Sequence, residues 1–387
     1  MSTTPHHDRP SGSLPAARIS NRNQAAGGED DGPLHLRIGL IGCGNIGAEL
    51  VHQVMERAKT LEDAGFAQLE VTRIAVRDTN RPRPQWVPQG LITADPMEIA
   101  ADPKVDLLVE LAGGVEPARQ WVEAALHTGK PVVTANKALM AEHGGELLGL
   151  AARLGLPLRY EASVGGGIPI LRAIESGLAA TRLDEIAGVI NGTTNYILTQ
   201  MEEAGVTFEQ ALAEAQRLGY AEADPTLDVE GIDAAQKLVI LTGLAFGVEV
   251  PMEAIPVTGI TKITRDYMAE QHKQGLSIRL VARARRGEAG RPPELSVMPE
   301  ALPSSHSLAR IAGVTNGIML VGQPLGEVVL AGPGAGPGPT ASAVLSDILD
   351  ASRPGAWPSR TWKEIASITR RYRGATGNTT RNVAKVQ

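Results

Sequence analysis

The amino-acid sequence predicts an α/β protein with a doubly wound parallel sheet and a second, α+β domain. Short apolar strands alternate with helices up to about residue 165, which is typical of a parallel sheet. A glycine-rich turn joins the first of these strands to the first helix. From about Gly166 the alternation stops, and a chain of 387 residues is long enough for two domains of roughly 100–200 residues each.

Residues 35–165 contain the segments of the parallel sheet. The run at 34–41 alternates and then becomes apolar, as expected of a strand that enters the interior of a sheet. Further strands are expected at 67–77, 105–110, 131–134 and 158–161, with helices at 48–59 and 118–128.

Residues 166–330 have the pattern of an α+β domain with its own sheet. Helices are expected near 170–176, 208–217 and 232–245, strands at 187–191 and 276–282, and a hairpin formed by 318–322 and 326–330. Both ends of the chain are polar. We expect a disordered tail at 1–34, and we interpret 351–387 as a C-terminal tail with one amphipathic stretch near 362–371.

The composition excludes several classes of protein. Hydrophobic residues make up 43% of the chain, so it can bury a core, and a net charge of -6 with 3% aromatic residues argues against nucleic acid as the partner. No apolar run approaches the ~20 residues of a transmembrane helix, and the N-terminus lacks the apolar region of a signal peptide. The single cysteine, Cys43, allows no intrachain disulfide. We therefore expect a cytoplasmic protein without a membrane partner.

The turn after the first strand, GCGNIG at 42–47, has the G-x-G-x-x-G spacing of a Rossmann-type dinucleotide site. Gly42 permits the tight turn, Gly44 lets the backbone approach a pyrophosphate, and Gly47 lets the helix pack closely on the strand. The phosphates would then lie at the positive end of the helix dipole. An ordinary glycine-rich turn is the alternative, but the place between a strand and a helix favours a dinucleotide.

The end of the second strand sets the choice of cofactor. An acidic residue there would bind the ribose 2′-hydroxyl of NAD, whereas Arg77 could pair with the 2′-phosphate of NADP. Arg81 and Arg83 follow closely and would add to the positive field. We favour NADP, and Asp78 keeps NAD as an alternative. The interpretation without a function is that these arginines form a solvated basic loop.

Two lysines stand where chemistry is expected. Lys137 follows a strand at the carboxyl edge of the sheet, where α/β enzymes place ligands. Asp233 and Lys237 are four residues apart, so they share one face of a helix that continues into an apolar, buried stretch. A lysine beside a carboxylate at the start of a buried helix can have its pKa tuned for proton transfer, although a routine ion pair has the same spacing.

The segment 160–169 combines the carboxylate of Glu161 with a glycine-rich turn. The carbonyl oxygens of such a turn could surround a monovalent cation. The same glycines would also suit a hinge between two domains. The spacing of these residues does not distinguish the two interpretations.

The chain resembles the homoserine dehydrogenase family from about Leu36 to Asp350. The motifs that carry the resemblance are AVRD at 75–78, ELAGG at 110–114, TANKAL at 134–139, YEASVGGGIPI at 160–170, GVINGTTNYIL at 188–198, LGYAEADP at 218–225, DVEGIDAAQKL at 228–238 and GAGPGPTASAV at 334–344. The resemblance implies NAD(P)-dependent interconversion of L-homoserine and L-aspartate 4-semialdehyde, in threonine and methionine biosynthesis.

The resemblance also implies roles for individual residues. Lys237 would be the general acid/base, and Lys137 would lie near both nicotinamide and substrate. The implied substrate-binding residues are Glu222, Asp233, Asp228 and the backbone of Gly219. The implied cofactor contacts are Gly42, Gly44, Asn45, Ile46, Gly47, Arg77, Gly113, Thr134, Lys137 and Gly336. A sodium or potassium site would be formed by Glu161 with the carbonyls of Val164, Gly166 and Ile168.

The family pattern further implies how the chain is organised. Residues 166–330 would serve catalysis and dimerisation in a homodimer, and 331–350 would return to the nucleotide domain, with Gly336 closing over the cofactor. Many members carry a C-terminal regulatory domain that binds amino acids, and the 37 residues after Asp350 are too few for one. We therefore expect no threonine feedback through such a domain. We also expect no fused aspartate kinase, because only the tail at 1–34 precedes the first strand and its glycine loop.

Other functions would require different residues in the sequence. Aspartate-semialdehyde dehydrogenase needs a catalytic cysteine, and the only cysteine here lies in the phosphate loop. A different NAD(P)-dependent alcohol or amino acid dehydrogenase would lack the motifs above. A cofactor-sensing protein with a dead active site would have lost Lys237, Asp233 or Glu222, and all three are present.

Overall fold

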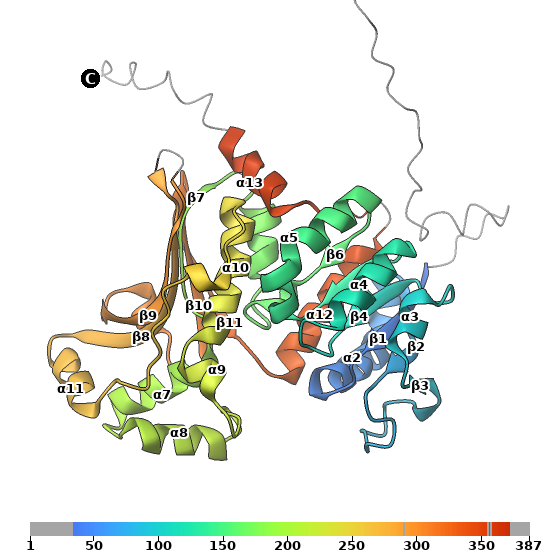
Figure 1. Cartoon of the computed structure of the whole chain (residues 1–387). Helices are drawn as coiled ribbons and strands as arrows, with labels where there is room; N and C mark the ends of the chain where they lie inside the picture. Colours follow the sequence, from blue (N-terminus) through green and yellow to red (C-terminus); the bar gives the residue numbers. More distant parts are fainter. Residues whose placement is uncertain (1–33, 289–290, 354–355, 357, 372–387) are drawn as a thin grey trace, which may run out of the picture.

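The computed structural model describes residues 34–288, 291–353, 356 and 358–371, and it contains two sheets with the helices that pack on them (Figure 1). The predicted parallel sheet and the separate antiparallel sheet are both confirmed. The expected disordered tail lies, except for residue 34, outside the described residues, as does the chain after residue 371. None of the helices in the described part of the chain is long and apolar enough to cross a membrane.

The first half of the chain forms six parallel strands in the order β3-β2-β1-β4-β5-β6. The chain changes direction across the sheet next to β1, and doubly wound sheets bind ligands at the carboxyl edge beside such a point. The strands are β1 (His35–Ile41), β2 (Gln68–Ala75), β3 (Ile92–Thr93), β4 (Leu107–Glu110), β5 (Val132–Thr134) and β6 (Leu158–Arg159).

Helices cover both faces of the parallel sheet. On one face, α2 (Asn45–Asp63) and α12 (Pro337–Ser352) pack through side chains such as Leu50 and Val344. On the other face lie α3 (Pro96–Ala101), α4 (Ala118–His127) and α5 (Lys137–Leu154). Because α12 packs beside α2, the chain returns to its first half after it has built the second sheet.

The second sheet has five antiparallel strands in the order β11-β10-β7-β8-β9. They are β7 (Arg182–Val189), β8 (Leu276–Arg285), β9 (Glu294–Pro303), β10 (Thr315–Gln323) and β11 (Gly326–Pro333). The predicted hairpin is confirmed as β10 and β11. The associated helices are α7 (Gly192–Glu203), α8 (Phe208–Arg217), α9 (Thr226–Val229), α10 (Ile232–Phe246) and α11 (Arg265–Lys273).

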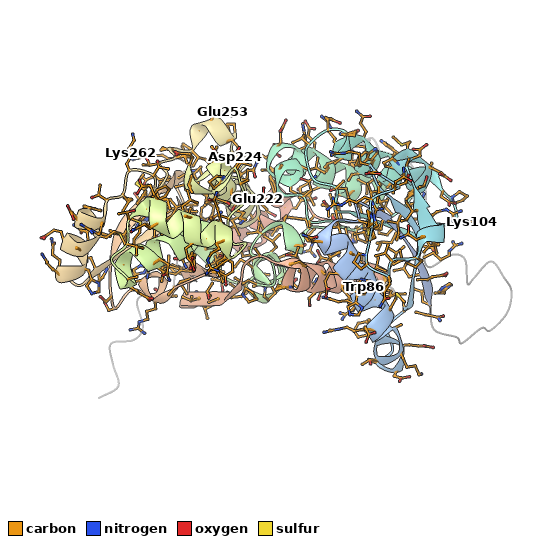
Figure 2. The ribbon with its side chains drawn as sticks, turned by 90° about the horizontal axis from the view of Figure 1, so that it is seen from below. Trp86, Lys104, Glu222, Asp224, Glu253 and Lys262 are labelled. Atoms are coloured by element: carbon orange, nitrogen blue, oxygen red, sulfur yellow. The ribbon has the colours of Figure 1, made fainter. Side chains whose placement is uncertain are left out.

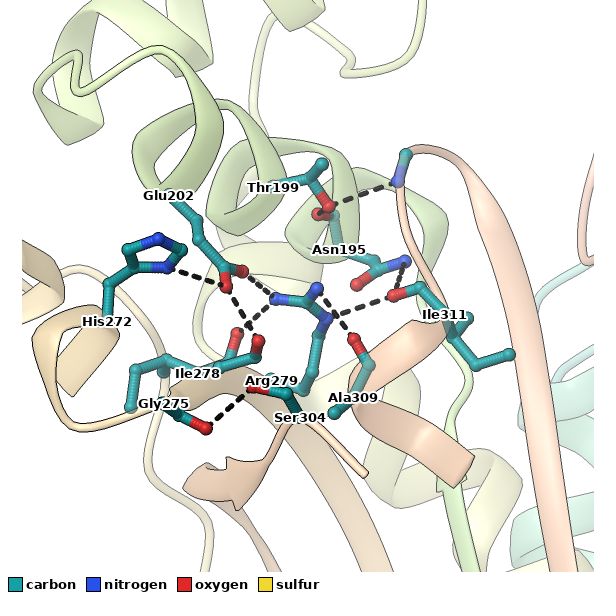
Figure 3. Close-up of polar contacts among 12 residues, drawn as sticks. Asn195, Thr199, Glu202, His272, Gly275, Ile278, Arg279, Ser304, Ala309 and Ile311 are labelled. Atoms are coloured by element: carbon teal, nitrogen blue, oxygen red, sulfur yellow. Dashed lines mark hydrogen bonds and ion pairs between the residues drawn. The ribbon is translucent and has the colours of Figure 1, made fainter. Parts of the chain in front are cut away.

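A buried arginine joins α7 to this sheet (Figure 3). The Arg279 guanidinium, on β8, forms an ion pair of 2.6 Å with Glu202 of α7. It also donates to the carbonyl oxygens of Ile311 and Ala309, both at 2.9 Å. Asn195 of α7 donates to the same Ile311 carbonyl at 3.2 Å. These bonds satisfy a buried charge and hold α7 in place, with its first residues directed to the candidate site.

Trp362, Ile365 and Ala366, which fall within the expected C-terminal tail, are buried. They lie on α13 (Trp362–Arg371), and Trp362 is only 3% exposed. The indole nitrogen of Trp362 donates to the hydroxyl of Tyr160 at 2.9 Å. A Cβ on Gly144 of α5 would lie 2.8 Å from the indole ring, and a Cβ on Gly243 of α10 would lie 2.4 Å from it. The ring therefore packs where two helices come together between the sheets (Figure 1).

Several elements differ from those predicted from the sequence. The unpredicted elements are the helices α3, α5, α7, α9, α11 and α12 and the strands β3 and β9. For α7 the reason is local: it begins with a glycine and two threonines, which are weak helix formers, and depends on the Asn191 cap. The strand expected at 158–161 ends at Arg159 because Glu161 begins a 3-10 turn. The helix expected near 170–176 divides into α6 (Ile170–Arg172) and a π-helical turn.

Candidate active site

The turn after β1 has the backbone that a dinucleotide site requires. Gly42 has a φ of +95°, and a Cβ there would lie 2.5 Å from the backbone nitrogen of Ala112. A Cβ at Gly47 would lie 2.4 Å from the carbonyl oxygen of Gly42, so α2 starts this close to β1 only because the residue is glycine. Both positions therefore exclude a side chain.

The N-terminus of α2 is open where a pyrophosphate would bind. Gly44 is the N-cap and provides no side-chain cap, and a Cβ there would meet no heavy atom within 4 Å. Asn45 and Ile46 form the first turn, and Asn45 is exposed. The N–H groups of a first helical turn have no partner within the helix, so they and the helix dipole favour an anion. The residues present therefore fit the phosphates of a dinucleotide.

The loop after β2 carries the residues expected to choose between NADP and NAD. Arg77 is exposed, and its guanidinium has no hydrogen bond to any other residue that the structure describes. The carboxylate of Asp78 turns back into the loop and accepts from the backbone nitrogen of Asn80 at 2.9 Å. Arg83 donates to the Asp78 carbonyl at 2.8 Å and lies beside Cys43, where burial raises the pKa of the thiol. Arg83 thus supports the loop, and Arg77 remains available to a ligand.

A buried carboxylate shapes the two loops at the carboxyl ends of β4 and β5. Glu110 accepts from the backbone nitrogens of Ala112 and Gly113, at 2.8 and 3.1 Å, and from the Thr134 hydroxyl at 2.7 Å. Thr134 in turn accepts from the backbone nitrogen of Asn136, the N-cap of α5, at 3.0 Å. Glu110 was not among the predicted site residues. The only signal was a charged residue at the end of an apolar strand.

The centre of the candidate site is one carboxylate shared by two lysines. The carboxylate of Asp233 lies 2.6 Å from the ammonium nitrogen of Lys237, and its other oxygen pairs with Lys137. Lys237 also donates to the carbonyl oxygen of Ile190 at 2.7 Å. The Asp233 side chain is 4% exposed, that of Lys237 11% and that of Lys137 42%. Lys137 thus faces the open side of the cluster.

The charge of Asp233 is set by these neighbours. Burial by itself would raise the pKa of this carboxyl, but Lys237 and Lys137 outweigh that effect and hold the pKa well below its usual range. Asp233 is therefore ionised at neutral pH. The contact with Lys137 joins α5, which follows β5 of the parallel sheet, to α10 of the second half, and these helices pack side by side (Figure 1).

Asp228 and Asn191 complete the cluster. The side-chain nitrogen of Asn191 donates to Asp228 at 2.7 Å and to Asp233 at 2.9 Å. Asp228 lies on α9, and Asn191 follows β7 and caps α7. Asp228 was among the predicted site residues and Asn191 was not, because residue 191 was expected to end the strand at 187–191, whereas β7 ends at Val189.

Glu222 and Gly219 lie on the loop between α8 and α9, apart from this cluster. Figure 2 shows Glu222 on the side of the second half that is nearer to the parallel sheet. Glu222 is exposed, and its carbonyl oxygen accepts from the Gln216 side chain at 3.1 Å. Gly219 has a φ of +78°, which fits the turn after α8. The Thr193 hydroxyl donates to the Tyr220 carbonyl at 2.6 Å and so ties this loop to α7.

Both oxygens of the Glu161 carboxylate already accept hydrogen bonds from the protein backbone. Its two oxygens accept from the backbone nitrogens of Leu171 and Arg172, both at 2.8 Å, and burial raises the pKa of this carboxyl. The backbone nitrogen of Glu161 donates to Asp347 of α12 at 2.8 Å. Burial and the Glu161 charge raise the pKa of Asp347 to about 7. A cation at this turn would therefore depend on main-chain carbonyl oxygens.

The other residues of the expected cation site belong to the same turn. Val164 is buried, and the carbonyl oxygen of Ile168 accepts from the backbone nitrogen of Ile170 at 2.8 Å. Gly166 has a φ of +56°, and a Cβ there would lie 2.6 Å from the carbonyl of Gly334. Gly336 has a φ of +108° and is the N-cap of α12. Within the described residues, no three His, Cys, Asp or Glu side chains are placed to hold a metal ion.

The family models match nearly all of the folded part of the chain. Residues 42–161 match the NAD binding domain of homoserine dehydrogenase, and residues 169–349 match the homoserine dehydrogenase model. The homoserine dehydrogenase of Pseudomonas aeruginosa is 43% identical over 319 residues, which cover 82% of this chain and 72% of that protein. That of Bacillus subtilis is 40% identical over 314 residues, covering 81% of this chain and 72% of that protein.

Solved structures of similar proteins have the same fold. The crystal structure of a homoserine dehydrogenase from Thiobacillus denitrificans has a TM-score of 0.79 at 42% identity, covering 83% of this chain and 74% of that chain. A hyperthermophilic archaeal homoserine dehydrogenase in complex with NADPH has a TM-score of 0.71 at 28% identity, covering 84% of this chain and 100% of that chain. The chain therefore belongs to the homoserine dehydrogenase family of NAD(P)-dependent oxidoreductases.

Proposed function

We propose that this chain interconverts L-homoserine and L-aspartate 4-semialdehyde, with Lys237 as the group that transfers the proton. The observation that carries the proposal is the cluster of Lys137, Asp233 and Lys237 at the junction of the two halves. It lies near the carboxyl edge of the parallel sheet, beside the loops that Glu110 organises. A proton-transfer group and a carboxylate are thus held next to the region where the nicotinamide end of a dinucleotide belongs.

The proton follows a short route. In oxidation, the neutral amine of Lys237 accepts the proton of the substrate hydroxyl, directly or through one water. In reduction, the ammonium form donates that proton to the oxygen of the aldehyde. Asp233 and the Ile190 carbonyl hold the lysine nitrogen in one position for both directions. The nicotinamide cofactor, when bound, supplies the hydride chemistry.

The carboxylates provide the substrate site. Homoserine carries an ammonium group, which Asp228, Asp233 and Glu222 would bind through charge-assisted hydrogen bonds. Asp228 and Asp233 are already adjacent, while Glu222 approaches from the exposed loop that starts at Gly219. Lys137 lies on the open side of Asp233, where it would meet the substrate and the nicotinamide.

The cofactor would lie along the carboxyl edge of the parallel sheet, in the domain formed by residues 35–165. Its phosphates would bind at the N-terminus of α2, and Arg77 would pair with the 2′-phosphate of NADP. Gly113 and Thr134 would line the nicotinamide side, since Glu110 holds both loops together. Gly336 would close the site from the return segment at 331–350, and its φ of +108° supports a close backbone approach there.

Three further features belong to this proposal. A sodium or potassium ion would bind main-chain oxygens of Glu161, Val164, Gly166 and Ile168. Two chains would associate through the five-stranded sheet of the domain at 166–330. Exposed apolar side chains on and beside its edge strand β11, Leu325 at 50% and Val329 at 37%, support that choice of surface. We place the protein in the cytoplasm.

The test follows nicotinamide absorbance with L-homoserine, for NADP and for NAD, in the wild-type protein and in Lys237→Ala. A rate that depends on homoserine and falls by about 10²-fold or more in the variant supports Lys237 as the proton-transfer group. Lys262→Ala is the matched control, because Lys262 is an exposed lysine of the same half (Figure 2). If the cofactor binds but neither homoserine nor the semialdehyde reacts, the protein is a cofactor sensor and the proposal is wrong.

A further inference from the structure

We propose that Asn191 is a positioning residue that fixes the Asp228 and Asp233 carboxylates and thereby the proton affinity of Lys237. The inference rests on the proposed role of Lys237. Asn191 is 5% exposed and belongs to neither the lysines nor the acids of the proposed reaction. Its side-chain amide lies between the two acids, with its nitrogen 2.7 Å from Asp228 and 2.9 Å from Asp233.

The two acids need a donor between them. Carboxylates that lie within reach of one amide repel each other in a buried site. The NH2 group of Asn191 has two hydrogens, so it can donate one to each acid. It thus holds two like charges close together without adding charge of its own.

The direction of the amide is fixed by its other end. The side-chain oxygen of Asn191 accepts from the backbone nitrogen of Thr194 at 2.8 Å and from the Thr194 hydroxyl at 2.9 Å. A flipped amide would place its oxygen against two carboxylates and its NH2 against an N–H donor. Only the observed direction satisfies all four contacts. The start of α7 therefore dictates that a donor faces the acids.

Asn191 acts on Lys237 through Asp233. The same oxygen of Asp233 accepts from Asn191 and from Lys237. The preceding residue, Ile190, accepts from Lys237 with its carbonyl. Two consecutive residues after β7 thus place the lysine and its carboxylate. Without the Asn191 donor, the negative charge of Asp233 would be shared with Lys237 and Lys137 alone, and Lys237 would hold its proton more tightly.

The charged groups that face Lys237 come from three helices. Asp233 lies on its own helix, α10, and Lys137 approaches from α5 through the other Asp233 oxygen. Asp228 approaches from α9 through the shared amide of Asn191. A change at residue 191 therefore alters the field of this whole group, rather than one hydrogen bond.

Two variants separate this role from that of a helix cap. In Asn191→Asp the side-chain oxygen still accepts from Thr194, so the cap is retained, but a third carboxylate replaces the donor. Asn191→Ser also retains a good cap, because serine is favoured at this position, yet its hydroxyl is too short to bridge both acids. Thr264→Ala is the control, since Thr264 caps the remote helix α11.

The first measurement is the pH dependence of homoserine oxidation. In Asn191→Asp the rising limb of kcat should move to higher pH by about one unit or more, as expected of an added adjacent charge. In Asn191→Ser, kcat should fall about tenfold and the KM for homoserine should rise, with the KM for the cofactor unchanged. Thr264→Ala should have the wild-type profile. A wild-type pH profile in Asn191→Asp, or wild-type kcat and KM in Asn191→Ser, with the protein folded, would overturn the inference.

The second measurement does not depend on turnover. The titration of Lys237 is followed by NMR in protein labelled with carbon-13 at lysine, the resonance being identified by its loss in Lys237→Arg. A midpoint that rises by about one pH unit in Asn191→Asp supports the inference even if homoserine is not the substrate. An unchanged midpoint refutes it even if the wild-type enzyme turns over homoserine, so the two failures are distinguishable.

Discussion

The indole of Trp362 should couple energetically to a glycine of the helix that carries Lys237. The ring is buried, and a Cβ on Gly243 would lie 2.4 Å from it. In the wild-type protein, Gly243→Ala should therefore destabilise the fold by about 1–3 kcal/mol, the usual cost of overpacking a core. Trp362→Ala should cost about 3–5 kcal/mol, because it removes a large buried ring.

The double variant should be more stable than the sum of the two changes predicts. Without the ring, the alanine methyl no longer collides, and alanine is a better helix former than glycine by about 1 kcal/mol. Gly243→Ala should thus become neutral or stabilising in the Trp362→Ala background. The coupling energy of the double-mutant cycle is then about 1–4 kcal/mol.

Urea denaturation followed by circular dichroism gives the four free energies of unfolding. Gly149→Ala on α5 is the control, because a Cβ there meets its nearest atom, on Arg153, at 3.4 Å. It should not destabilise either background. Additive effects of Gly243→Ala and Trp362→Ala would refute the packing argument.

Three other predictions follow from the described contacts. The pKa of Asp347, raised to about 7, means that the folded chain binds an extra proton between about pH 4 and pH 7. The free energy of unfolding should therefore fall as the pH rises through this range, by about 4 kcal/mol in total. When this free energy is measured by urea denaturation at a series of pH values, it should depend less on pH in Asp347→Asn. Arg77→Ala should raise the KM for NADP about tenfold and leave the KM for NAD unchanged. Equal effects on both cofactors would show that Arg77 does not bind the 2′-phosphate. Gly47→Ala should weaken NADPH binding at least about tenfold in a fluorescence titration, because the added methyl displaces the Gly42 carbonyl, and unchanged affinity would contradict this.

The sequence predicted those features that depend on neighbours along the chain. The glycine turn is a local pattern, and the contact of Asp233 with Lys237 follows from a spacing of four on a helix. The contact of Lys137 with Asp233 joins residues 96 positions apart, and no local pattern predicts it. Both lysines were nevertheless found, Lys137 by its place after a strand at the carboxyl edge of the sheet and Lys237 by its spacing from Asp233, and the family resemblance gave them their roles.

Other features could not be predicted, for distinct physical reasons. Asn191 was missed because it was expected to lie in the strand at 187–191, and its contacts to Asp228 and Asp233, 37 and 42 positions away, have no local sequence signature. Trp362 lies in a polar stretch, so composition indicated a tail although the ring fills a gap between glycines of two helices. The hydrogen bonds that the Glu161 carboxylate accepts come from a helix start ten residues later, and the turn between them is not predictable from a local pattern.

The shared carboxylate of Asp233 has a consequence for how the two halves of the chain depend on each other. Lys137 belongs to the helix that follows the parallel sheet, Lys237 belongs to a helix of the second half, and both pair with the same side chain. A substitution at Asp233 would therefore free both lysines at once, so that the proton-transfer group and the contact between the halves would be lost together.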